Sequence, residues 1–174
     1  IRGAATVLIL ETNTPVLVAA TNTGSLYYMG GNNGCVFSSE KFILEKFITK
    51  NNLGELFDAP YDVYFDNENV VQPDLLFISK DSLHIIGEKN VHGAPDLVIE
   101  IISENSAYRD MVQKKKLYAK FGVKEYWVVI PEGEEIEIYT LKDKTFQLYK
   151  TYGKDNTLES SLLEGLKIGL MDIF

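Results

Sequence analysis

The clearest hydrophobic pattern in the chain is an apolar run, then an amphipathic segment, then a second apolar run. Residues 97–103 form a continuous run dominated by β-branched side chains, which is typical of a strand covered on both faces. Residues 106–121 carry apolar side chains at helical spacing, with Ser106 as the N-cap and Gly122 after the last turn. Residues 125–130 form the second run, which we expect to be the last central strand. The pattern predicts two parallel strands joined through a helix by a right-handed crossover.

Shorter patterns on either side predict further helices, strands and hairpins. Together they indicate an α/β (α+β) fold in which a mixed central sheet is flanked by helices and carries added β-hairpins. The further predicted elements are a helix at 39–51, strands at 56–65 and 75–79, a connector with a weak hairpin or flexible loop at 80–94, an antiparallel pair at 136–141 and 146–152, and a closing strand with a short terminal helix.

Residues 1–39 differ in composition from the remainder of the chain. Arg2 and Glu11 are the only charged residues there, and Thr, Asn, Gly and Ala are frequent. We expect two or three strands in this N-terminal β extension, with residues 16–20 pairing with a return strand at 24–31. The length of 174 residues suits one domain, spanning residues 1–174.

Ionisable side chains interrupt the apolar pattern at positions where a plain core would be apolar. Alternation in the strand at 97–103 places Glu100 on the same face as Asp96, in the middle of a strand that should be buried. A buried carboxylate needs a partner, a metal or a raised pKa. Lys114 falls near the centre of the apolar stripe of the following helix, so Glu100 and Lys114 are expected to be neighbours. A Glu on an exposed patch, or one paired with a structural lysine, is the ordinary alternative.

Composition adds weaker restrictions. The net charge of −8 argues mildly against tight, non-specific DNA binding, although bound divalent ions and a lysine-rich helix face would offset it. One cysteine excludes an internal disulfide and fits a reducing cytoplasm. No apolar run reaches membrane-spanning length, and the first residues lack a signal-peptide pattern, so we expect a cytoplasmic protein without a membrane partner.

Three stretches together resemble the Uma-type restriction endonuclease family of the PD-(D/E)XK nuclease superfamily, over about residues 40–174. They are VVQPDLLFIS at 70–79, PDLVIEIIS at 95–103 and RDMVQKKKLYAKFGVKEYWVVIP at 109–131. In most of the superfamily the acid and the lysine lie two residues apart on one strand, but that position is Ile102 here. The family pattern places the lysine on the helix, where Lys114 matches it. Residues 1–39 do not show the Tyr-Glu pair that the family usually carries there.

The resemblance implies a metal-dependent DNA endonuclease. Asp74 and Glu100 would hold Mg²⁺ (or Mn²⁺), because a hairpin between them brings the acids of two neighbouring strands together. Lys114 would orient the attacking water or stabilise developing negative charge. DNA is the expected substrate, and a homodimer is expected because two active sites suit two strands. For Asp74 the ordinary alternative is a turn-capping aspartate.

Other residues are candidates for lesser roles. Asp96 lies about 13 Å along the strand from Glu100, too far to share its ion, and would support the site or the start of the strand. Glu45 on the first helix and Asp110 beside Lys114 are further supporting acids, with a surface acid as the default. His92 and Lys115 are candidate substrate contacts, although periodicity makes Lys115 solvated and a loop histidine is the ordinary interpretation of His92.

Two other functions are compatible with the sequence. The missing ExK lysine and the acidic balance favour a non-catalytic module of the same fold that binds nucleic acid or protein. A phosphoesterase acting on RNA or nucleotides would use the same metal chemistry. Divalent-ion binding that needs both Asp74 and Glu100 separates the enzymes from the module.

Overall fold

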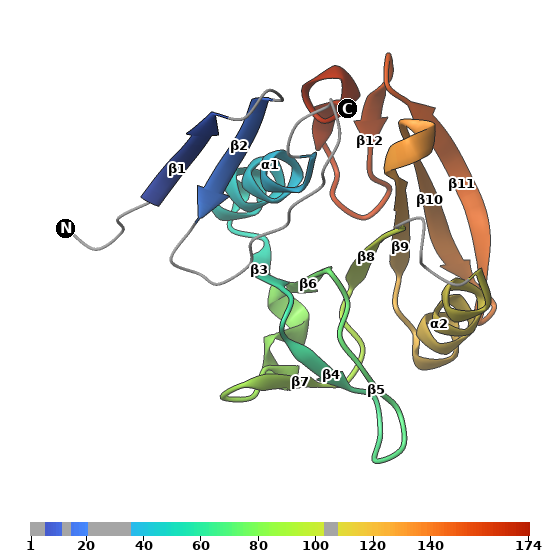
Figure 1. The fold of residues 1–174 in the computed structure, drawn as a ribbon. Helices are drawn as coiled ribbons and strands as arrows, with labels where there is room; N and C mark the ends of the chain where they lie inside the picture. Colours follow the sequence, from blue (N-terminus) through green and yellow to red (C-terminus); the bar gives the residue numbers. More distant parts are fainter. Residues whose placement is uncertain (1–5, 12–14, 21–35, 103–107) are drawn as a thin grey trace.

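A mixed six-stranded sheet forms the centre of the structure, a computed structural model that describes residues 6–11, 15–20, 36–102 and 108–174 (Figure 1). The strand order is β11-β10-β9-β8-β6-β3, and β8 and β9 are parallel while the other neighbours are antiparallel. The predicted mixed α+β architecture is confirmed. The strands are β3 (Gly54–Asp58), β6 (Leu75–Ser79), β8 (Leu97–Ile101), β9 (Glu125–Ile130), β10 (Glu135–Lys142) and β11 (Thr145–Gly153).

Two α-helices and three smaller sheets accompany the central sheet in the described residues. The helices are α1 (Val36–Asn51) and α2 (Tyr108–Phe121). Short 3₁₀ turns lie at Lys80–Ile85, Pro131–Gly133 and Leu170–Asp172. The smaller sheets are β1 (Thr6–Glu11) with β2 (Pro15–Ala20), β5-β4-β7 (Val70–Val71, Asp62–Tyr64 and Asn90–His92), and β12 (Thr157–Glu159) with β13 (Lys167–Gly169).

The two faces of the central sheet bury different sets of side chains. On one face, Leu97 and Ile99 of β8 pack with Leu44 of α1 and with residues near the C-terminus, which lies close to α1 in Figure 1. On the other face, Val98 packs with Tyr118 of α2. Strand alternation therefore directs Glu100, two residues after Val98, toward α2.

Helix α2 ends where the sequence predicts. Gly122 has a φ of 94°, a left-handed conformation that favours glycine, and its N–H donates to the carbonyl of Tyr118. The chain then returns as β9, parallel to β8, which confirms the predicted strand–helix–strand order and the parallel pairing. The proposed N-cap, Ser106, lies outside the described residues.

Two predictions about elements need correction. The single strand expected at 56–65 is two strands, β3 and β4, because Pro60 lies between them and has no N–H for a strand ladder. The strand at 125–130 is not the last of the central sheet, since β10 pairs with it and β11 extends the sheet further. Strand β2 pairs with β1, while the return strand expected at 24–31 lies outside the described part of the chain.

Candidate active site

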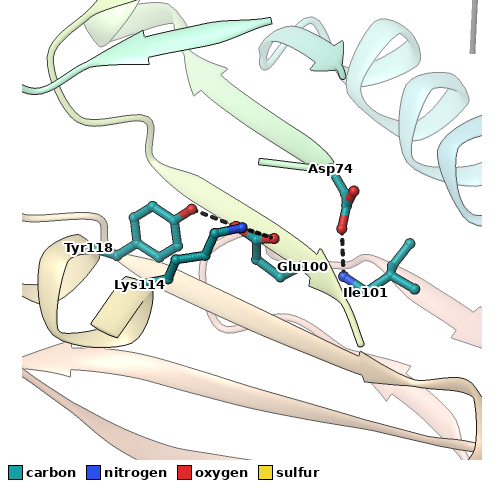
Figure 2. Close-up of polar contacts among 5 residues, drawn as sticks. All are labelled: Asp74, Glu100, Ile101, Lys114 and Tyr118. Atoms are coloured by element: carbon teal, nitrogen blue, oxygen red, sulfur yellow. Dashed lines mark hydrogen bonds and ion pairs between the residues drawn. The ribbon is translucent and has the colours of Figure 1, made fainter. Parts of the chain in front are cut away.

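Antiparallel pairing of β6 with β8 brings the two candidate carboxylates together. Leu75 pairs with Ile99, so extending the register by one residue places Asp74 opposite Glu100 on the same face of the sheet. Asp74 is anchored there, because its Oδ2 accepts a hydrogen bond of 2.8 Å from the N–H of Ile101 (Figure 2). The predicted juxtaposition of the two acids is thus present.

Helix α2 supplies two polar contacts to Glu100. Nζ of Lys114 lies 2.9 Å from Oε2, and the hydroxyl of Tyr118 donates to Oε1 at 2.5 Å (Figure 2). Lys114 and Tyr118 are four residues apart, so they share one face of the helix. Glu100 itself is 6% exposed. The expectation that Glu100 and Lys114 are neighbours is confirmed.

The electrostatic balance at this cluster favours added positive charge. Burial raises the pKa of Glu100, nearby Asp74 raises it further, and Lys114 and Tyr118 offset only part of this effect. Burial also raises the pKa of Asp74, against the hydrogen bond from Ile101 and the charge of Lys114. Two carboxylates thus face one lysine, an arrangement that a divalent cation would neutralise.

The donor set fits a hard divalent cation. Within the described residues, no group of three or more His, Cys, Asp or Glu side chains is placed to hold a metal ion. Among the described residues, Asp74 and Glu100 are the side chains at this site that could hold an ion, with water or substrate oxygens completing its shell. Mg²⁺ binds in this way, through one or two carboxylates and additional oxygens.

Asp96, the other acid on this face, lies at the opposite end of β8 and has its own partners. Its carboxylate accepts a hydrogen bond of 2.7 Å from the N–H of Ser79 and pairs with Nζ of Lys124 at 2.6 Å. Burial would raise the pKa of Asp96, but the hydrogen bonds from Lys124 and Ser79 outweigh it and lower the pKa below its ordinary value. Asp96 therefore stabilises the start of β8 through its contacts with Ser79 and Lys124.

In the described structure, no contact joins the other candidate residues to Asp74 or Glu100. Glu45 is exposed on α1, the helix that covers the opposite face of the sheet from Glu100. The exposed His92 lies on β7, where its ring stacks on Tyr64 with centroids 5.5 Å apart. Asp110 belongs to α2, but its side chain lies outside the described part of the structure.

The lysines of α2 do not form one solvated basic face. Lys115, predicted to be solvated, is half-buried with Nζ 3.1 Å from the centre of the Tyr139 ring, and burial lowers its pKa. That prediction is wrong because Tyr139 comes from β10, which extends the sheet beneath the helix. Lys124 is paired with Asp96, while Lys116 and Lys120 are exposed.

Two residues with important polar contacts were missed in the sequence. Tyr118 counts as apolar in a helical stripe, so its hydroxyl bond to Glu100 left no signal in the periodicity. Glu125, 1% exposed, accepts hydrogen bonds from Trp127 and from the segment around Ser160 and Ser161. Trp127 itself is buried in the core.

Comparison with known proteins places these residues in a family. Residues 24–171 match the sequence profile of the Uma2 family, described as "Putative restriction endonuclease". The chain belongs to this family. The match begins at residue 24 and so includes part of the N-terminal extension that the motifs did not cover. Membership supports a nuclease function in general, that of a hydrolase acting on nucleic acid.

A solved structure supports the fold independently. The chain is similar to a protein from Anabaena variabilis ATCC 29413, described as "a putative nuclease belonging to DUF820", with a TM-score of 0.65 and 15% sequence identity. The similarity covers 95% of this chain and 93% of that one. No curated protein matches the chain. Among the described residues, no helix is both long and apolar enough to cross a membrane.

Proposed function

We propose that this Uma2 family protein is a metal-dependent endonuclease that hydrolyses phosphodiester bonds in DNA. One observation carries the proposal: the pairing of β6 with β8 brings Asp74 near Glu100, and Lys114 is paired to Glu100 at 2.9 Å. Family membership adds the nucleic acid as substrate. Two acids that can hold a metal ion, with a lysine beside them, are groups that can support hydrolysis of a phosphodiester.

Asp74 and Glu100 would hold Mg²⁺ (or Mn²⁺). When bound, the ion supplies a water of lowered pKa and a positive charge beside the phosphate. The hydrogen bond from Ile101 fixes Asp74, and the contacts from α2 fix Glu100, so both carboxylates are oriented before the ion arrives. Lys114 lies beside the pair, where it would stabilise negative charge that develops on the phosphate or orient the water.

The test compares metal binding and DNA cleavage in matched variants. We expect Glu100→Gln and Asp74→Asn, which remove charge with little change in shape, to abolish Mn²⁺ binding in calorimetry and lower nicking of supercoiled DNA by about 10³-fold. We expect Lys114→Met to keep Mn²⁺ binding and to lose nicking, about 10²-fold. Glu55→Gln is the control, because Glu55 is exposed on β3.

Each contrary outcome replaces the proposal with a defined alternative. Mn²⁺ binding that needs both acids, but with RNA or nucleotides cleaved in preference to DNA, would make the protein a phosphoesterase of another substrate class. Wild-type protein that neither binds Mn²⁺ nor nicks DNA would indicate a non-catalytic module of the same fold.

A further inference from the structure

Both oxygens of Glu100 are held from the same helix, by residues one turn apart. The hydroxyl of Tyr118 donates to Oε1, and Nζ of Lys114 contacts Oε2 (Figure 2). The two contacts differ in rigidity. Tyr118 is fully buried, and its ring packs against Phe65 and Tyr126 with centroids 6.0 and 5.4 Å away. Lys114 is a flexible side chain that is 26% exposed.

The rigid contact limits what the flexible one can do. The terminal torsion of a glutamate is broad, so a carboxylate held at a single oxygen turns easily. A lysine ammonium has three donors on a flexible stem and can therefore pair with both oxygens of one carboxylate. With Oε1 occupied by Tyr118, the carboxylate oxygen that Lys114 contacts is Oε2. Without that hydroxyl, the ammonium would compete with a metal ion for the whole carboxylate.

We propose that Tyr118 is a positioning residue of the active site: its hydroxyl fixes Oε1 of Glu100, which restricts Lys114 to Oε2 and holds the carboxylate in one orientation. This inference rests on the proposed function, since it concerns how Glu100 receives a metal ion. The lysine of this site lies on helix α2, whereas the strand position where most of the superfamily has it, residue 102, is isoleucine in this chain. The proposed role of Tyr118 explains why a tyrosine lies on the same helix as that lysine.

Tyr118→Phe tests the inference because it removes one oxygen and keeps the buried ring. We expect Mn²⁺ affinity measured by calorimetry to fall about 10-fold, the effect of losing one hydrogen bond to a charged group. We expect kcat for nicking to fall by a similar factor, with KM for DNA unchanged within about twofold. The loss in Mn²⁺ affinity is the primary readout, because it does not depend on catalysis.

Tyr152→Phe is the matched control. Tyr152 is 1% exposed, and its hydroxyl donates to the carbonyl of Glu159 at 3.0 Å, within the cluster on the other face of the sheet. Both variants lose one hydrogen bond of a buried tyrosine, so both should lower the unfolding midpoint in urea. Only Tyr118→Phe should change Mn²⁺ affinity. Equal Mn²⁺ affinity in the two variants would reduce Tyr118 to a structural residue and overturn the inference.

A double variant tests the reason for the effect. If Tyr118 acts by restricting Lys114, then Tyr118→Phe should change Mn²⁺ affinity less than twofold in a Lys114→Met background. A full 10-fold loss in that background would contradict the inference. Failure of the proposed function looks different: Mn²⁺ affinity would then be insensitive to Glu100→Gln itself.

Discussion

Strand β8 offers a comparison within one element, because buried acids lie at its two ends on the same face. Asp96 directly precedes the strand and is 2% exposed, and Glu100 lies near its end and is 6% exposed. Both side chains are almost inaccessible to solvent, yet the pKa of Asp96 is lowered and that of Glu100 is raised. The donors around Asp96 outweigh the effect of its burial, whereas those around Glu100 do not.

The neighbours that lower the pKa of Asp96 are hydrogen-bond donors and a positive charge. Ser79 and Lys124 contact its carboxylate, and its backbone carbonyl accepts hydrogen bonds from the N–H groups of Lys124 and Glu125. Glu125 follows the same rule, since its buried carboxylate is surrounded by donors from Trp127 and Ser160. These acids are compensated within the fold.

Glu100 has Asp74 opposite it, so its compensation is incomplete. Lys114 and Tyr118 contact both of its oxygens, but the second carboxylate adds repulsion. Incomplete compensation of buried charge at a specific cluster is typical of functional sites. The comparison therefore indicates how to interpret a buried acid. An acid whose neighbours leave its charge unbalanced is a candidate for a functional site, whereas an acid whose charge is fully compensated has a structural role.

The largest expected effect comes from removing the compensated acid. Asp96→Asn should lower the free energy of unfolding by about 2 kcal/mol, because Lys124 loses its ion pair and the N–H of Ser79 loses a charged acceptor. Urea denaturation at pH 7 measures this loss. Mn²⁺ affinity should stay within about twofold of wild type, since Asp96 lies about 13 Å along the strand from Glu100. A large loss of Mn²⁺ affinity in folded Asp96→Asn would remove the distinction between the two ends of the strand.

Replacing the uncompensated acid should have the opposite sign. Because the pKa of Glu100 is raised in the folded state, the metal-free protein should lose stability as pH rises above the ordinary carboxyl pKa of about 4, until Glu100 is ionised. Glu100→Gln resembles the protonated form and removes this contribution. We expect it to raise the free energy of unfolding at pH 8 by about 1 kcal/mol and to make stability less dependent on pH between about 4 and 8.

Urea denaturation in the presence of a chelator, repeated across this pH range, tests that prediction. Glu55→Gln serves as control, since it removes an exposed acid from the same sheet. A stability loss of about 2 kcal/mol in Glu100→Gln at pH 8 would make Glu100 as structural as Asp96, because the carboxylate would then be stabilised by the fold.

Local periodicity was enough to predict the central part of this site. Alternation along β8 and the helical stripe of α2 directed Glu100 and Lys114 toward each other, and the hairpin between β6 and β8 brought Asp74 opposite Glu100. Both periods are short-range properties of the backbone, so a sequence shows them directly. The resemblance to the family then gave these residues their expected roles.

Contacts that depend on distant segments were not predictable in this way. The carboxylate of Glu125 accepts a hydrogen bond from Ser160, 35 residues further on. The ammonium of Lys115 packs on the ring of Tyr139, and Tyr139 belongs to a strand that was not expected to continue the central sheet. Tyr118 illustrates a different limit. A hydrophobic stripe records that a tyrosine is buried, but it does not record where the hydroxyl points.

The smallest expected effect comes from the lysine that compensates Asp96. Lys124 is 57% exposed, so Lys124→Met should lower the free energy of unfolding by only about 0.5 kcal/mol at pH 7, less than Asp96→Asn. Ser79 still donates to the carboxylate, and water can take the place of the ammonium. The pKa of Asp96 should move up toward its ordinary value, because one of the groups that lowers it is lost.

The pH dependence gives this last prediction its sign. An acid with a lowered pKa in the folded state contributes stability above its ordinary pKa of about 4, and that stability is lost as pH falls through the folded value. Lys124→Met should therefore lose less stability than wild type on acidification from pH 5 to pH 2, measured by urea denaturation. Lys116→Met is the control, because Lys116 is exposed on α2. Equal acid sensitivity in the two variants would show that the N–H of Ser79 alone keeps Asp96 ionised, and the contrast with Glu100 would then rest on one hydrogen bond.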